Sequence, residues 1–155
     1  MRMKKIACLW LMCWLGLQTQ AWAAWVYFDG NYGNALQYYD PNIEAKGKSV
    51  TLRIFNMLTV QDMVPIYDAG APKKLRMVVY SSDLSTYEFN CKEQTIHLLS
   101  RTFYNDVDGK FPILTYKHTD KFIEQGNSDF AKQFRKRAVY PNHDKPLKMM
   151  NLACR

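Results

Sequence analysis

The chain has 155 residues, a formal net charge of +7, and 48% hydrophobic residues. Three of the positive charges lie in the first 23 residues, which leaves only +4 for the remainder. A basic excess of that size does not by itself indicate a nucleic-acid-binding protein. About 132 residues follow this first segment, and that length suits one domain with a real hydrophobic core rather than several.

The first 23 residues have the pattern of a cleavable leader. Arg2, Lys4 and Lys5 form a basic start, an apolar stretch follows, and Ala21-Trp22-Ala23 provides the small side chains of a cleavage site. The apolar stretch is shorter than the roughly twenty residues that span a bilayer, and neither of its cysteines has the preceding residues that lipid attachment requires. The sequence therefore predicts a signal peptide over residues 1–23 and export to the periplasm or cell surface, without a lipid anchor or a transmembrane segment.

The cysteines predict one covalent loop. Cys8 and Cys13 leave with the leader, whereas Cys91 and Cys154 remain in the mature chain. Two thiols that survive export into an oxidising compartment are expected to pair. A Cys91–Cys154 disulfide would then attach the end of the chain to its middle. The alternative is a pair of free, buried thiols.

Strand-like runs separated by turn signals occupy most of the mature chain. The clearest is Ser49–Met57, in which apolar and polar residues alternate. The strands predicted in this way, in chain order, cover residues 25–28, 35–39, 49–57, 74–80, 87–91, 95–104 and 111–116. Residues 58–73 are interpreted as a loop, because Pro65, Gly70 and Pro72 interrupt the pattern.

The C-terminal quarter favours helix instead. Ser128 can cap a helix over Asp129–Val139, and Asp144 can cap a second helix over 145–153. The apolar residues of the first helix recur at helical spacing; they are Phe130, Ala131, Phe134 and Ala138. Strands followed by helices predict an α+β domain. We expect an antiparallel meander sheet of about five to six strands, with one or two C-terminal helices packed on it and one disulfide.

Several short motifs follow one another in a recognisable order. They are Trp25, Gln37-Tyr38-Tyr39-Asp40-Pro41, Gly47-Lys48-Ser49-Val50, Tyr87-Glu88-Phe89-Asn90-Cys91, Leu98-Leu99 and Leu152-Ala153-Cys154. In this order they resemble the surface-adhesin protein E family of Gram-negative bacteria, whose members are small exported domains. The chain departs from the family at Asn90, where an aspartate is usual, and over about 117–140, which looks like an insertion.

The resemblance covers nearly the whole mature chain, so residues 24–155 are expected to form a single adhesin-E-like domain. It implies a protein that attaches to host epithelium and to matrix proteins such as vitronectin and laminin. The alternative from the sequence is a soluble periplasmic accessory protein that binds an envelope partner, and the missing lipid site favours that alternative.

Two groups of side chains are candidates for binding. The first is a basic segment that could contact anionic glycans, sulfated matrix polymers or lipid head groups. It consists of Lys132, Arg135, Lys136, Arg137, Lys145 and Lys148, with His143 beside them. The alternative is an ordinary solvated helix face.

The second group is an N-terminal aromatic cluster, made of Trp25, Tyr27, Phe28, Tyr32, Tyr38 and Tyr39. In a strand-rich domain most of these residues are expected to be core residues or cross-strand pairs. Any that remain exposed on an edge strand would offer a homodimer interface or a place for a partner's strand.

Sequence signals for catalysis are lacking. His97, His118 and His143 fall in no metal-binding spacing. Asp106-Val107-Asp108-Gly109 has part of a calcium-loop pattern without its closing glutamate, which favours a hairpin turn. We therefore expect no enzyme, no cofactor and no metal, and interpret the chain as an exported binding domain. A small hydrolase would need His97 or His118 to meet an acid and a nucleophile.

Overall fold

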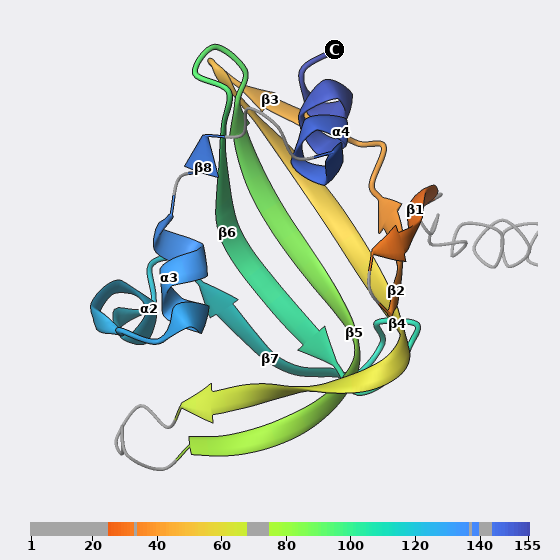
Figure 1. Cartoon of the computed structure of the whole chain (residues 1–155), viewed down its shortest axis with the longest axis vertical. Helices are drawn as coiled ribbons and strands as arrows, with labels where there is room; N and C mark the ends of the chain where they lie inside the picture. The colour runs from red at the N-terminus through yellow and green to blue at the C-terminus, as the bar shows by residue number, and fades with distance from the viewer. Residues whose placement is uncertain (1–24, 33, 68–74, 137, 140–143) are drawn as a thin grey trace, which may run out of the picture.

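The computed structural model describes residues 25–155, except 33, 68–74, 137 and 140–143. Its strands are β1 Val26–Tyr32, β2 Ala35–Tyr39, β3 Glu44–Lys46, β4 Ser49–Tyr67, β5 Leu75–Asn90, β6 Thr95–Tyr104, β7 Pro112–Lys117 and β8 Ala138–Val139. Its helices are α2 Lys121–Gln125, α3 Asp129–Arg135 and α4 Asp144–Ala153 (Figure 1). This is the α+β class that the sequence predicts. The predicted leader lies outside the described residues.

The strands form one antiparallel sheet in the order β1-β2-β4-β5-β6-β7. Two short strands extend its sides. β3 pairs with β4 beyond the end of β2, and β8 pairs with β6 beyond the end of β7. The central part is the predicted meander, since β4, β5, β6 and β7 follow one another both in sequence and in space. The sheet has more strands than predicted, because neither β3 nor β8 shows a clear strand pattern.

β4 continues well beyond its predicted end. Residues 62–67, predicted as loop, pair with 75–80 of β5, while 58–61 form a bulge opposite Ser81. The prediction failed at Pro65, which lies within the strand in register with Met77. The pairing of β4 with β2 stops at Leu58, which lies opposite Ala35, the first residue of β2. The outer part of β4 therefore pairs with β5 alone. A proline is tolerated on such an edge. The rest of the predicted loop, 68–73, lies outside the described residues.

β5 joins two strands that were predicted separately. The polar residues between them lie within the strand, and Ser81, Ser82, Asp83 and Ser85 are all buried. Ser81 and Ser82 donate hydrogen bonds to the backbone carbonyls of Asn105 and Asp106. A polar run can cross the middle of a sheet in this way because its groups find partners there.

The helices differ from the prediction in length and number. Ser128 caps α3 as predicted, because its Oγ accepts a hydrogen bond from the Ala131 N–H. α3 ends at Arg135 rather than Val139, and Ala138 and Val139 instead pair with the open edge of β6. Helix α2 was not predicted. α4 matches its prediction within one residue, because it begins at Asp144, the residue predicted as its cap; the side chain of Asp144 lies outside the described residues.

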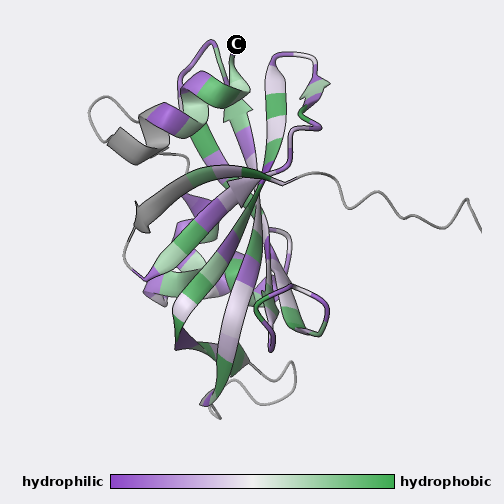
Figure 2. Cartoon of the chain, turned by 90° about the vertical axis from the view of Figure 1, so that its right-hand side faces the viewer, coloured by the Kyte–Doolittle hydropathy of each residue, from purple (hydrophilic) through white to green (hydrophobic). Residues whose placement is uncertain are grey.

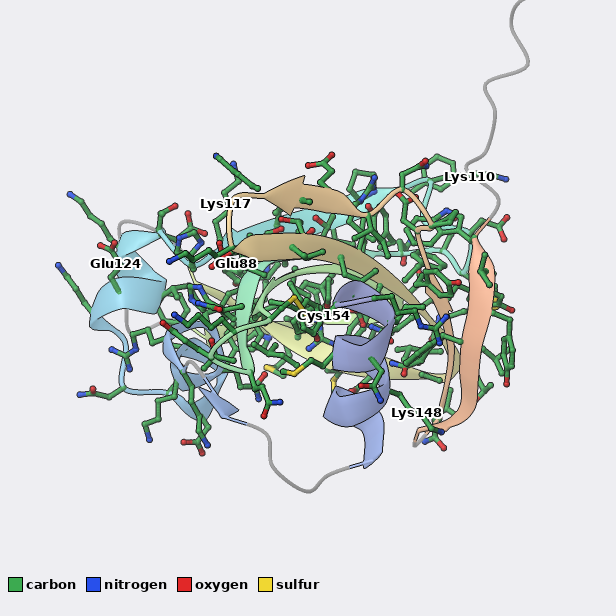
Figure 3. The ribbon with its side chains drawn as sticks, turned by 90° about the horizontal axis from the view of Figure 1, so that it is seen from above. Glu88, Lys110, Lys117, Glu124, Lys148 and Cys154 are labelled. Atoms are coloured by element: carbon green, nitrogen blue, oxygen red, sulfur yellow. A yellow bond between two sulfur atoms is a disulfide. The ribbon has the colours of Figure 1, made fainter. Side chains whose placement is uncertain are left out.

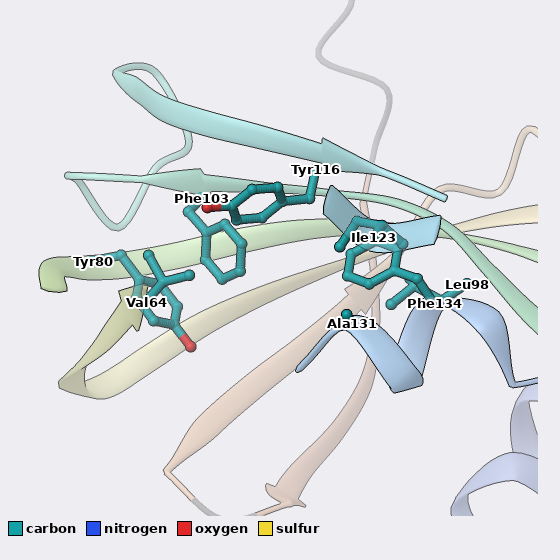
Figure 4. Packing of buried hydrophobic residues seen from close by; sticks show 8 residues of the cluster. All are labelled: Val64, Tyr80, Leu98, Phe103, Tyr116, Ile123, Ala131 and Phe134. Carbon is teal, nitrogen blue, oxygen red and sulfur yellow. The ribbon is translucent and has the colours of Figure 1, made fainter. Parts of the chain in front are cut away.

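The helices cover one face of the sheet in two separate places. The α3 cluster comprises Val64, Tyr80, Leu98, Phe103, Tyr116, Ile123, Ala131 and Phe134 (Figure 4). The α4 cluster comprises Leu52, Ile54, Phe89, Ile96, Met149, Met150 and Ala153. Hydrophobic and hydrophilic bands alternate along the long strands (Figure 2), as expected for a sheet with one buried face. Ile123, Ala131 and Phe134 are fully buried, so α2 and α3, which lie in the segment interpreted as an insertion, contribute to the core.

The predicted disulfide is present. Cys91 and Cys154 are bonded, with their Cα atoms 5.6 Å apart. Cys91 begins the turn after β5 rather than lying within the strand, and Cys154 follows the last residue of α4. The bond attaches the end of α4 to the sheet across which that helix lies (Figure 3).

Gly109 makes a close contact that a larger residue would disturb. It has φ +70°, and a Cβ at this position would lie 2.8 Å from Phe55 Cε2. Gly47 has a similar φ of +63° but open space around it. We expect Gly109→Ala to lower the free energy of unfolding more than Gly47→Ala, for which only the backbone term of about 1 kcal/mol applies. Urea denaturation of both variants measures the difference. Equal losses of unfolding free energy would mean that the Phe55 side chain can move aside without destabilising the fold.

Candidate functional site

A cavity of about 500 Å³ opens on the helix-bearing face of the sheet. Its floor is formed by polar side chains from four adjacent strands, which we call the polar row: Gln37, Asn56, Asp83 and Arg101. Met149 of α4 borders the cavity on one side and Tyr80 of the α3 cluster on another. The bulge of β4 forms part of the rim, through Leu58, Val60 and Gln61. The cavity thus lies where the two hydrophobic clusters leave the sheet uncovered.

The pairing of the strands places the polar row. Gln37 of β2 lies opposite Asn56 of β4, and Asn56 lies opposite Asp83 of β5. Opposite residues of an antiparallel pair project from the same face of the sheet. Arg101 of β6 lies opposite Ser85, two residues along from Asp83, so it reaches the same face.

Hydrogen bonds connect the polar row from end to end. The Gln37 side-chain amide donates to Asn56 Oδ1, and Asn56 Nδ2 donates to Asp83 Oδ1 at 2.8 Å. Arg101 donates to both carboxylate oxygens, from Nε at 3.0 Å and from an Nη at 2.8 Å. Ser85 Oγ donates to Asp83 as well. A network of this kind holds its members in fixed positions within the sheet.

Asp83 and Arg101 form a buried ion pair. The Asp83 side chain is 1% exposed and that of Arg101 24%. Burial alone lowers the pKa of the Arg101 guanidinium, but the charge and hydrogen bonds of Asp83 more than offset this and raise the pKa above its ordinary value. Arg101 therefore stays protonated and carries a counter-charge for the Asp83 carboxylate at 2.8 Å.

Tyr80 and Asp62 border the cavity beside the bulge. The Tyr80 hydroxyl lies 3.4 Å from Asp62 Oδ2. Burial is the largest cause that raises the pKa of the Tyr80 phenol to about 12. At physiological pH the phenol therefore remains a neutral donor. Asp62 is exposed, and it also accepts a hydrogen bond from the Met63 N–H.

Gln37 has an acceptor that no residue in the described part of the chain pairs with. Among the buried side-chain atoms of the described residues, its Oε1 is the one without a hydrogen-bond partner. The residue is 3% exposed and lines the cavity. Buried polar groups nearly always have partners, so an orphan calls for an explanation.

Among the described residues, the basic side chains predicted for binding lie on two different helices. Lys132, Arg135 and Lys136 are exposed on α3 or at its end, whereas Lys148 is exposed on α4. These helices lie at different places over the sheet (Figure 1). Lys132 pairs with Asp129 at 2.9 Å, and the Arg135 guanidinium donates to the Glu124 and Gly126 carbonyls. Arg137, His143 and the side chain of Lys145 lie outside the described part of the chain.

The N-terminal aromatic cluster forms pairs at the edge of the sheet. Tyr27 stacks edge-on against Tyr38, and Phe28 against Tyr39. Trp25 contacts Phe55. Tyr27 is 56% exposed on the edge strand β1, and the side chain of Tyr32 is not described. The cluster thus consists mainly of half-buried cross-strand pairs, one of the outcomes that the sequence allows.

Two of the histidines lie together. The rings of His97 and His118 have centroids 5.1 Å apart, and each ring contacts a backbone carbonyl, of Phe134 and Leu99 respectively. No group of three His, Cys, Asp or Glu side chains that could hold a metal ion occurs among the described residues. None of the described helices has the length and apolar character needed to span a membrane.

The chain matches a known protein family over its described part. The sequence profile described as Surface-adhesin protein E matches residues 25–155. The chain belongs to this family. No curated protein sequence matches it.

Two solved structures of protein E from Haemophilus influenzae are similar in structure. Crystal form II has 13% sequence identity and a TM-score of 0.43, and the match covers 83% of this chain and 95% of that one. The selenomethionine form has 12% identity and a TM-score of 0.43, and covers 83% and 94%.

Residues of the adhesin-E motifs have structural roles in this chain. Asp40 is buried, pairs with Arg53 at 3.2 Å and accepts two hydrogen bonds from Asn42. Asn90, which stands in place of the usual aspartate, accepts hydrogen bonds through Oδ1 from the N–H groups of Lys92 and Glu93. An amide oxygen thus closes the turn that presents Cys91. The polar row, by contrast, was missed from the sequence as a site.

Proposed function

We propose that this member of the adhesin-E family is exported by cleavage after Ala23, forms a single domain over residues 24–155, and attaches the cell to host surfaces. Its ligand would be held in the cavity above the polar row. The observation that carries this proposal is a fixed set of hydrogen-bonding groups in an open cavity of a surface-adhesin domain. The family match begins at Trp25, the second residue after the predicted cleavage site.

The chemistry of the polar row suits binding rather than catalysis. Both oxygens of Asp83 already accept hydrogen bonds from Arg101, and Oδ1 also accepts from Asn56 and Ser85. A general base needs an accessible carboxylate or imidazole close to the substrate, and Asp83 could act as one only if the ion pair broke. Groups that are held in this way can orient a ligand without an ordering penalty.

The proposal is tested by comparing adherence of cells with and without the protein. We expect wild-type cells to adhere to epithelial monolayers and to surfaces coated with vitronectin or laminin. A deletion strain should adhere less, and plasmid-borne wild-type protein should restore adherence. Equal adherence of the deletion strain to all three surfaces would overturn the proposal.

The exposed lysines of α3 are a second candidate contact, for an anionic surface polymer. Lys132 and Lys136 are exposed at the C-terminal half of that helix, where cations are also tolerated well. Charge reversal of both to glutamate should make the protein elute from a heparin column at lower salt. The matched control reverses Lys117 and Lys121, which are also exposed. If both double variants shift equally, retention reflects net charge alone.

A further inference from the structure

We propose that the cavity above the polar row binds a neutral saccharide unit through its hydroxyl groups. This inference rests on the proposed function, since it names the ligand class of the same site. The size of the cavity is suitable, because about 500 Å³ lies within the usual range for small-molecule sites. The cavity is open to solvent, so the rest of a glycan could extend out of it.

The polar lining matches the hydrogen-bonding needs of hydroxyl groups. A hydroxyl donates one hydrogen bond and accepts others, so it pairs with amides, carboxylates and guanidinium groups alike. The amide side chains that line the cavity are Asn34, Gln37, Asn56 and Gln61. Gln37 Oε1 has no partner within the described protein and is itself buried, so a ligand hydroxyl would supply the missing donor after a small shift of the Gln37 side chain toward the cavity that it lines. An apolar ligand would leave this acceptor unsatisfied.

The charges around the cavity favour a neutral ligand. The charged side chains that line it are Asp62, Asp83 and Arg101. Arg101 and Asp83 neutralise each other at 2.8 Å, which leaves the exposed Asp62 as the net charge. A sulfated or carboxylated sugar would therefore meet a carboxylate without a compensating cation. The site selects against the anionic polymers that the surface lysines would attract.

The walls supply the apolar contact that a sugar ring needs. A sugar presents C–H groups on the faces of its ring as well as hydroxyls at its edge, and aromatic side chains pack against such faces. Tyr80 and Tyr87 both line the cavity, together with Ile54, Leu58, Val60 and Met149. Polar groups on the floor and apolar groups on the walls match the two kinds of surface that one ring presents.

The test is a titration of the exported, purified protein with galactose, N-acetylglucosamine, lactose and maltose, followed by NMR. Saturation transfer from protein to sugar shows binding, and the side-chain signals of Gln37, Asn56 and Arg101 Nε–H report its place. We expect at least one of these sugars to shift those signals. Gln37→Leu should weaken the binding of that sugar about tenfold, because the substitution removes the acceptor that has no partner. The matched control is Gln133→Leu, on the exposed surface of α3, and should bind as the wild type does.

A second variant keeps the test decisive if Gln37→Leu fails to fold. Val60 is 59% exposed on the rim, so Val60→Trp should close the cavity without disturbing the core, and should abolish binding. The proposal is overturned if no sugar moves the cavity signals, if Val60→Trp binds normally, or if a heparin fragment moves those signals more strongly. Adherence that is undiminished in Gln37→Leu cells would overturn both the saccharide site and the placement of the ligand in the cavity, whereas attachment to host surfaces is overturned only by equal adherence of the deletion strain.

Discussion

Replacing Arg101 by methionine should lower the free energy of unfolding by about 3 kcal/mol, measured by urea denaturation. The substitution removes the partner of Asp83, whose side chain is 1% exposed, and leaves a buried carboxylate without its counter-ion. Breaking a buried ion pair on one side costs about 3–5 kcal/mol. We expect the lower end, since Arg101 keeps 24% exposure and water can partly replace it.

Two further variants show how much of that lost stability is due to the unpaired buried charge. In Arg101→Met combined with Asp83→Asn, the stranded charge is gone, so part of the lost stability should return. Asp129→Asn breaks the ion pair with Lys132 on the surface, where the side chain of Asp129 is 95% exposed and that of Lys132 58%. This variant should leave the unfolding midpoint unchanged. If Arg101→Met is no worse than this surface variant, the polar row does not hold the sheet together.

Reducing the disulfide should have the largest effect, a loss of about 4 kcal/mol. Cys91 and Cys154 are 63 residues apart in sequence, and closing a loop of this length restricts the unfolded chain by about that amount in the chain-entropy model. The measurement compares denaturation midpoints with and without reductant. A variant with both cysteines replaced by alanine should match the reduced wild type and should not respond to reductant.

The loss of stability on reduction should affect the C-terminal helix first. The α4 cluster depends on Met149, Met150 and Ala153, which lie just before the bonded Cys154. Reduction should therefore make the C-terminus sensitive to proteolysis before the remainder of the sheet. An unchanged midpoint and an equally resistant C-terminus would contradict the role given to this bond.

Much of the architecture could be predicted because alternation and turn residues act locally. β2 and β6 have the predicted bounds, and α4 differs by one residue. The disulfide was predictable for a different reason, since removal of the predicted leader would leave only two thiols. β8 could not be predicted from Ala138 and Val139, because its pairing depends on an open edge of β6 that only the folded sheet creates.

The candidate site was missed because the segment that carries Asp83 looks like a loop in the sequence. The run Ser81-Ser82-Asp83 interrupts the apolar pattern of β5 and suggests a break between two strands. Its side chains are nevertheless buried and hydrogen-bonded. The available signal was a polar run between two segments in which apolar and polar residues alternate as in strands. Positions where local rules fail are often functional, but the partners Asn56 and Arg101 are distant in sequence and become visible only through the register.

The measurement that tests the adhesin account most directly is protease shaving of intact cells, followed by mass spectrometry. An adhesin must face outward, so we predict that added trypsin releases peptides of this protein, from exposed lysines such as Lys132 and Lys136, while a periplasmic marker stays intact. The alternative of a periplasmic accessory protein predicts the opposite. If the protein is cleaved only after the outer membrane is permeabilised, it does not face a host, and the account is contradicted.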